Sequence, residues 1–212
     1  MASTIEICNL ALGYVGEPPI ASFDDRRPAA EYCKLYYDGA LRALLREHPW
    51  NFATDREYLT PVDVPEAWQP TYTHAYVLPA RCLHLQRLID QHGNQSLSFT
   101  SAAHPAQGRD IILCRIPSAI AEFTRYVDNA NAYGPFFIQA LARKLQSMIA
   151  RSLLKNSSGA SQIIQEAETL YRQELESAKV HDAREGGRLS RLGTVWDGGH
   201  VYWEDAMRGE LQ

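Results

Sequence analysis

The segment from residue 7 to residue 53 constrains the fold most, because it reads as two helices folded against each other. Ser3 and Glu6 have the S-x-x-E spacing of a capping box, which predicts a helix that begins beside them. The prolines of the turn at 17–20 then end this helix, since proline has no backbone N–H to donate. Apolar residues recur at helical spacing from 28 to 47. The two apolar stripes predict a helical hairpin.

The second helix is expected to end at Pro49, and two large aromatic rings follow it directly. Asp24 or Asp25 is placed to cap its start. Trp50 and Phe52 are most simply anchors that fold the chain back onto the helices. Burying one such ring contributes roughly 2 to 3 kcal/mol, a sizeable part of a domain's net stability of about 5 to 15 kcal/mol. Loss of Trp50 is therefore expected to unfold much of the protein.

Between residues 72 and 127 the apolar pattern changes from helical spacing to short runs bounded by turn residues. Leu97 and Phe99 alternate with small polar residues, as in a strand with one buried face. Turn residues at 92–94 and 108–110 separate the runs. This pattern predicts a small antiparallel sheet of about three or four strands. An irregular loop insertion is the alternative, because the alternation breaks at Arg87 and Arg125.

Helical spacing returns in the second half of the chain. One apolar stripe runs from 135 to 155, polar and glycine residues at 156–159 interrupt it, and a further stripe runs from 161 to 184. The third helix has several small side chains, which permit a helix of the same chain or of a neighbouring copy to approach closely: Ala140, Ala142, Ser147, Ala150 and Ser152.

These elements predict a mainly α fold, an antiparallel helical bundle with an inserted small antiparallel β-sheet lobe and an extended C-terminal tail. The expected units are the N-terminal helices of the bundle (1–60), the inserted β-rich lobe (61–133), the C-terminal helices (134–185) and a docking tail (186–212). The tail has little periodicity but contains Trp196, Tyr202 and Trp203, rings of the kind that anchor interfaces. These rings either dock on a partner or fold back on their own bundle.

Composition and charge set further bounds. With 212 residues, 45% of them hydrophobic, the chain can bury one good core and a small second lobe. No apolar run approaches the roughly 20 residues that span a bilayer, and the N-terminus lacks the layout of a signal peptide. We therefore expect no membrane partner and a cytoplasmic place of synthesis. A net charge of −4 argues against tight binding of DNA, which needs clustered Lys and Arg.

A search for enzyme chemistry returns no recognisable motif. The sequence contains no H-E-x-x-H, G-x-S-x-G or phosphate-binding glycine pattern, and the seven histidines share no metal-ligand spacing. Cys8, Cys33, Cys82 and Cys114 form no C-x-x-C pair and are expected to be reduced core thiols. The expectation is a protein with no catalytic residue, no metal and no cofactor.

Seven segments resemble one known family in the same order along the chain. They are 8–13, 19–25, Ala30 with Cys33 and Tyr37, 48–53, 75–83, 126–128 and 136–141. Together they are similar to the head-to-tail adaptors of tailed bacteriophages, the tail tubular protein A family of short-tailed phages. The resemblance covers about residues 4 to 185 and is carried by helix caps and core residues, not by reactive groups.

The resemblance implies a non-catalytic virion protein at the head–tail junction, assembled in the cytoplasm of the bacterial host. About twelve copies would form a closed ring beneath the portal protein. This ring would extend the DNA channel and be a platform for tail nozzle or tail fibre proteins. Double-stranded DNA would pass without sequence-specific binding, which a mildly negative wall favours.

The resemblance also assigns roles to residues. The positions expected to determine the fold are Leu10, Ala30, Cys33, Tyr37, Trp50 and Phe52. The tail rings Trp196, Tyr202 and Trp203 would dock on the portal, although this segment matches no motif of the family. Two alternatives remain open: a virion-associated peptidoglycan hydrolase that uses Glu57 or Glu66, and a scaffold or regulatory oligomer of the host.

Overall fold

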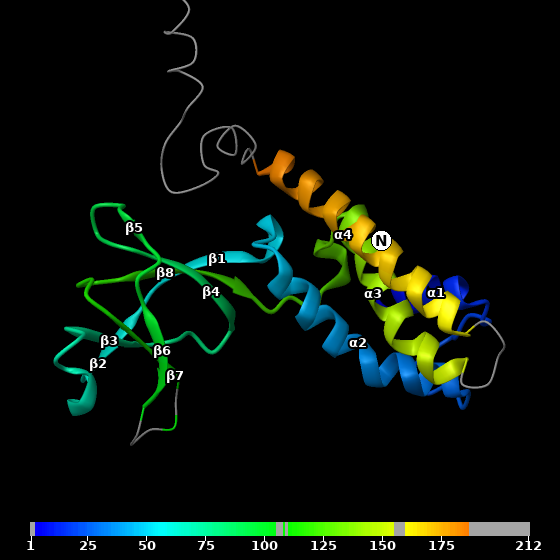
Figure 1. Ribbon diagram of the computed structural model, residues 1–212, viewed down its shortest axis with the longest axis horizontal. Coiled ribbons are helices and arrows are strands. Elements are labelled where there is room, and N and C mark those ends of the chain that lie inside the picture. Colours follow the sequence, from blue (N-terminus) through cyan, green and yellow to red (C-terminus); the bar gives the residue numbers. More distant parts are fainter. Residues whose placement is uncertain (1–2, 105–107, 109, 155–159, 187–212) are drawn as a thin grey trace, which may run out of the picture.

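The chain forms two lobes, one helical and one built of strands (Figure 1). The computed structural model describes residues 3–104, 108, 110–154 and 160–186. The helices of the first lobe are α1 (Thr4–Val15), α2 (Pro28–Glu47), α3 (Pro135–Leu153) and α4 (Ala160–Glu185). Helix α3 contacts the other three, so it is the centre of this lobe. Its small residues Ala140, Ala142 and Ala150 are fully buried, which lets the neighbouring helices approach closely.

Helix α1 is capped as its sequence predicts. The Glu6 N–H donates to Ser3 Oγ (3.1 Å), and the Ser3 N–H donates to Glu6 Oε2 (2.7 Å). Gly16 ends the helix with a φ of 80°, a left-handed conformation that glycine adopts without a steric penalty. The capping box is therefore confirmed.

Helix α2 begins differently from the prediction. Its N-cap is Arg27, and no side chain caps it. The Asp25 carboxylate instead accepts from the Arg27 guanidinium (2.7 Å), which holds the pKa of Asp25 below its usual value. Pro28 occupies the first turn and has no N–H that needs an acceptor. The expectation that Asp24 or Asp25 caps this helix is wrong.

The second lobe contains two four-stranded antiparallel sheets. The first has the order β1-β8-β4-β5 and the second the order β2-β3-β7-β6. The strands are β1 (Thr54–Tyr58), β2 (Thr60–Val62), β3 (His74–Val77), β4 (Cys82–Ile89), β5 (Gln95–Ser96), β6 (Thr100–Ala103), β7 (Asp110–Cys114) and β8 (Ile120–Arg125). Leu88 and Phe123 of the first sheet share one apolar core with Tyr76 and Ile112 of the second. The sheets therefore stabilise each other as a small sandwich.

The second sheet is covered on its other face as well. Ala75, Ile111 and Leu113 form a separate apolar cluster, against which Val64 and Tyr72 pack. Strand β7 is thus buried on both faces and has no alternation of apolar and polar residues.

The expectation of a mainly α bundle with one small inserted sheet is wrong. Helices make up 49% of the described residues and strands 21%, and the strands form two complete sheets. Strand β1 lies within the range 1–60 that was assigned to helices. The sequence pattern did not indicate a strand here, because the residues of β1 are mostly polar and partly or fully exposed at the edge of the sheet. Strand β4 contains register shifts after Cys82 and after Leu85, so its alternation is also disrupted.

The polypeptide crosses between the lobes at two neighbouring places. Thr54, at the start of β1, pairs with Thr124, near the end of β8. The β lobe is thus an insertion whose first and last strands lie side by side (Figure 1). None of the described helices combines the length and the apolar character that a bilayer span requires.

Candidate functional site

The aromatic residues after α2 fix the end of this helix within the helical lobe. The Trp50 side chain is 1% exposed, and its Nε1–H donates to the Leu44 carbonyl (2.9 Å). The Trp50 and Phe52 rings each meet the Phe137 ring nearly edge-on, with centroids 4.9 Å apart. This geometry is favourable for aromatic pairs and fixes the end of α2 against α3.

The residues expected to determine the fold lie in or against the helical core. Ala30, Cys33, Tyr37 and Trp50 are buried, whereas Leu10 and Phe52 are partly buried and pack against the same cluster. Leu10 and Trp50, which lie on different elements, thus contribute to one cluster. All six side chains thus contribute to the packing of this core.

The cysteines are free thiols, and two of them meet. A hydrogen bond between Cys8 and Cys33 and the burial of the pair raise the pKa of the Cys8 thiol. Burial also raises the pKa of Cys82 to about 11. In the part of the chain that the structure describes, no group of three or more His, Cys, Asp or Glu residues could hold a metal ion.

A polar contact ties the end of α4 to the same junction. Asp182 of α4 is 8% exposed, and its Oδ1 accepts the Asn51 N–H (2.9 Å) while its Oδ2 meets His48 Nε2 (3.1 Å). The Asn51 side-chain amide also donates to the Asp182 carbonyl. A Cβ on Gly186 would lie only 2.5 Å from the Asn51 side chain, so the chain passes here at close range. We call these four residues the α4 latch.

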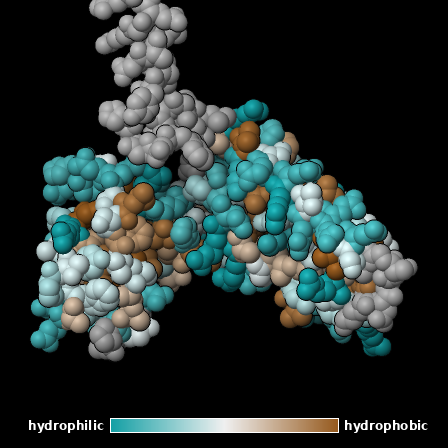
Figure 2. Space-filling model, in the orientation of Figure 1, coloured by the Kyte–Doolittle hydropathy of each residue, from teal (hydrophilic) through white to brown (hydrophobic). Residues whose placement is uncertain are grey.

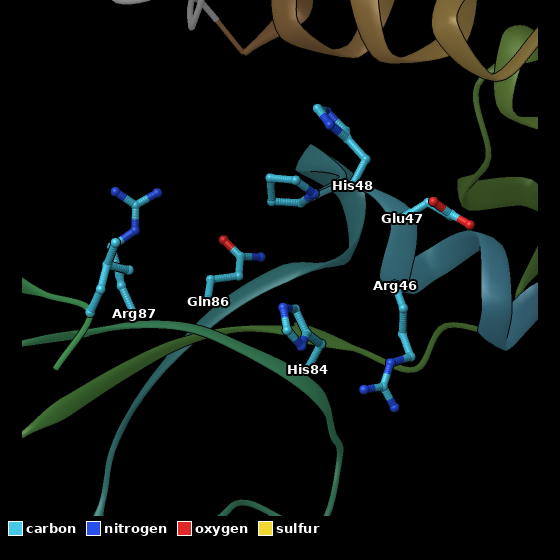
Figure 3. A pocket seen from close by; sticks show the side chains of 8 residues that line it. Arg46, Glu47, His48, His84, Gln86 and Arg87 are labelled. Carbon is cyan, nitrogen blue, oxygen red and sulfur yellow. The ribbon is translucent and has the colours of Figure 1, made fainter. Parts of the chain in front are cut away.

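A cleft of about 430 Å³ lies beside the latch, between the end of α2 and strand β4 (Figure 3). We call it the interlobe cleft. Its lining residues are Arg46, Glu47, His48, Pro49, His84, Gln86, Arg87 and Leu97. Arg46, Glu47 and Arg87 are its charged lining residues, and the lining residue His48 contacts Asp182 (3.1 Å). Burial and, second, the positive charge of Arg46 lower the pKa of His84.

Arg87 is paired with a buried carboxylate. Glu122 of β8 is 3% exposed and contacts Arg87 Nε through Oε1 (2.9 Å) and Arg56 Nη2 through Oε2 (2.5 Å). Two guanidinium groups from the strands on either side of β8 therefore share one negative charge. Buried carboxylates need such partners.

The candidate hydrolase residues are not brought together. Glu57 of β1 pairs with Arg81 (2.8 Å) and lines a shallow cleft of about 140 Å³. Glu66 begins the short 3-10 helix η2 (Glu66–Trp68) and lines a different cleft, of about 490 Å³. The two carboxylates thus share no cavity.

The predicted docking residues Trp196, Tyr202 and Trp203 lie outside the described residues. Within the described part, the large apolar side chains with high exposure are Leu35 (66%), Tyr58 (73%), Trp68 (38%), Leu97 (78%) and Val180 (44%). In Figure 2 hydrophobic residues gather over the central part of the β lobe, whereas the helical lobe is mostly hydrophilic with separate hydrophobic positions.

The interlobe cleft is the feature that sequence reasoning missed. Its residues come from α2, β4 and the segment after β5, and no spacing in the sequence links them. One signal was present, because the apolar alternation breaks at Arg87, where the structure has a register shift in β4. Comparison with protein-family models found no match, and comparison with curated proteins found none. A proposal of function therefore depends on the sequence and structure of this chain.

Proposed function

We propose that this protein is a head-to-tail adaptor of a tailed bacteriophage. It attaches beneath the portal, extends the DNA channel and supports tail assembly. The observation behind the proposal is that segments with the family resemblance, distant in sequence, pack together. Cys8, Ala30, Trp50 and Phe137 belong to different segments, yet all lie in one apolar cluster. Because protein interiors are closely packed, the size and shape of each of these side chains restrict those of its neighbours. A resemblance shared by the whole cluster therefore supports the family assignment more strongly than the same matches at unrelated positions.

The two-lobed architecture suits a subunit of a ring. A closed ring needs two different complementary surfaces on each subunit. The helical lobe has exposed apolar side chains on separate helices, Leu35 on α2 and Val180 on α4. In the proposed ring the helical lobes pack laterally through these surfaces, and the β lobes contact the next tail component.

The charge of the protein agrees with a conduit for DNA. Affinity for phosphates comes from clustered Lys and Arg, and the chain has a net charge of −4. A mildly negative wall does not retain the duplex as it slides past. In this role no side chain makes or breaks a bond, and each part of the protein works through its surface.

The proposal is tested by mixing the full-length protein with the portal protein of the same virion. We expect the isolated chain to be monomeric or weakly associated, and to form closed rings of about twelve copies on the portal. Cryo-electron microscopy and mass measurement report the assembly. Failure to bind the portal at saturating concentration overturns the proposal, as does clearing of a peptidoglycan suspension by the protein.

The docking role of the tail is tested on the full-length chain by replacing Trp196, Tyr202 and Trp203 together with serine. Aromatic anchors dominate interface energies, so portal binding is expected to be lost. The matched control is Trp68→Ser, which removes an indole that is 38% exposed on the β lobe. Undiminished binding by the triple variant removes the tail from the mechanism.

A further inference from the structure

Strand β6 forms one edge of the second sheet. It pairs with β7 on one side, and no strand of the described residues pairs with its other side. An edge strand presents a row of backbone N–H and C=O groups that find no partner within the sheet. Such an edge pairs readily with another extended chain unless charged side chains, a proline or a short length prevent it. Whether β6 can bind a partner therefore depends on how its edge is protected.

Each of the other edge strands, β1, β2 and β5, is protected. Strand β1 has consecutive charged residues at 55–57, and the Arg56 N–H donates to the Asp55 carboxylate (2.8 Å). Strand β2 has only three residues and contains Pro61, and β5 has only two residues. Strand β6 differs from all of them, because its residues 100–103 are small, uncharged and at least partly exposed.

The side chains of β6 fix the strand in place and leave room beside it. The Thr100 hydroxyl is hydrogen-bonded to that of Tyr72 (2.6 Å), and Ala102 packs against the apolar cluster of the second sheet. Just before the strand, Phe99 packs against the core between the sheets, whereas Leu97 is 78% exposed. A strand added beside β6 would thus meet a fixed edge of small residues, with an exposed apolar side chain at its start.

The end of β6 is acidic. Ala103 pairs with Asp110 of β7, and the next residue, His104, lines a cleft of about 490 Å³ together with Asp63 and Glu66. Within the described part of the chain, no Lys or Arg lies within ion-pair distance of these three carboxylates. Opposite charges at neighbouring positions stabilise a sheet, so a basic side chain on an added strand is favoured at this end.

We propose that the free edge of β6 binds an extended segment of another protein as an additional antiparallel strand. The segment has uncharged side chains where it pairs with residues 100–103, a lysine or arginine at its N-terminal end, and an apolar residue at its C-terminal end, beside Leu97. Antiparallel pairing places the basic end beside His104, close to the carboxylates. A second copy of β6 does not fit, because residues 97–104 contain no Lys or Arg. This inference goes beyond the adaptor function and does not depend on it.

A synthetic peptide with blocked ends, Lys-Lys-Thr-Val-Thr-Val-Thr-Val, tests the proposal on the full-length protein. At millimolar concentration we expect it to shift the NMR signals of the amides at 100–103 and to slow their hydrogen exchange, because backbone pairing protects the edge. The matched peptide has two glutamates in place of the lysines. It should bind about tenfold more weakly, because it replaces attraction by repulsion at the acidic end. High salt should reduce this difference.

The variant Ala103→Lys should abolish binding of the lysine peptide, since a lysine on an edge strand opposes pairing and here repels the basic end. The control is Thr60→Lys, at an exposed position of β2, the opposite edge of the same sheet, and it should bind the peptide as the unaltered chain does. Thermal unfolding reports whether each variant is folded, and Ser101→Lys replaces Ala103→Lys if that variant is not.

Three outcomes overturn the proposal. The first is the absence of any change at 100–103 with the lysine peptide. The second is equal affinity for the two peptides, because the acidic end would then select nothing. The third is protection of 100–103 that rises with protein concentration alone, since a second copy would then occupy the edge.

Discussion

The α4 latch yields the sharpest test of how helix α4 is joined to the segment after α2. The change is Asp182→Ala in the full-length protein. It removes the acceptor of the Asn51 N–H (2.9 Å) and the partner of His48 (3.1 Å) at a site that is 8% exposed. A hydrogen bond to a charged group contributes about 1.5 to 3 kcal/mol, and a buried donor left unpaired adds its desolvation penalty. We expect the free energy of unfolding to fall by about 3 to 5 kcal/mol.

The conservative change Asp182→Asn separates charge from hydrogen bonding. The amide oxygen can still accept from the Asn51 N–H, so we expect a smaller loss of about 1 to 2 kcal/mol. The control is Glu168→Ala, an exposed acidic residue of the same helix, which should change stability by less than about 0.5 kcal/mol. Urea unfolding measures all three variants.

Hydrogen exchange locates the effect within the chain. Loss of the Asp182 carboxylate should accelerate exchange at the Asn51 amide, because its acceptor is removed, whereas the Gly186 amide keeps the Asp182 backbone carbonyl as its acceptor. Equal stability and equal exchange in Asp182→Ala and Glu168→Ala would refute the reasoning, since the junction would then not depend on Asp182.

Three further outcomes follow. Trp50→Ala should cost about 3 to 5 kcal/mol in unfolding free energy, because it empties a fully enclosed site and removes the indole N–H that donates to the Leu44 carbonyl. Cys8, with its raised pKa, should react with a thiol reagent only after unfolding, as timed labelling with and without urea would show. Burial and the bond to Asp38 raise the pKa of Tyr126 to about 12, above its unfolded value of about 10. Its stabilising contribution is thus complete below about pH 10 and is lost as the pH rises through about 12, so Tyr126→Phe should show a smaller alkaline loss of stability in urea titrations.

The helices were predictable because their signals are local. The capping box at Ser3 and Glu6 and the proline at Pro28 act within one turn, and no distant residue is needed to interpret them. The small residues of α3 are also a local signal, and they indicated from the sequence alone that other helices approach this helix closely. The error at the start of α2 arose because Asp25 has a nearer partner, Arg27, than the helix end.

The strands were predicted less well because their signals depend on partners. Ile111 and Ile112 face opposite sides of β7, and both sides are covered, so the sequence shows a continuous apolar run. Strand β1 is hard to predict for a different reason, because its sequence is largely charged. Its charged residues pair with residues distant in sequence: Arg56 with Glu122, and Glu57 with Arg81. Such pairings are set by the register of the sheet.

The candidate site was the least predictable part. The interlobe cleft combines Arg46, at the end of a helix, with Arg87, at a register shift in a strand. Neither position is unusual by itself, and the two line one cleft only once both lobes are folded. The buried Glu122 that balances Arg87 is likewise recognisable only from its 3% exposure.

The pairing of Thr54 with Thr124 has a consequence for how such a protein can change over time. Because the entry and exit of the β lobe are adjacent strands, the whole lobe is a cassette that could be exchanged through two closely spaced junctions. A recombination event there would replace the β lobe and leave the helical packing around Trp50 intact. The protein could thus acquire a new neighbour while keeping its old framework.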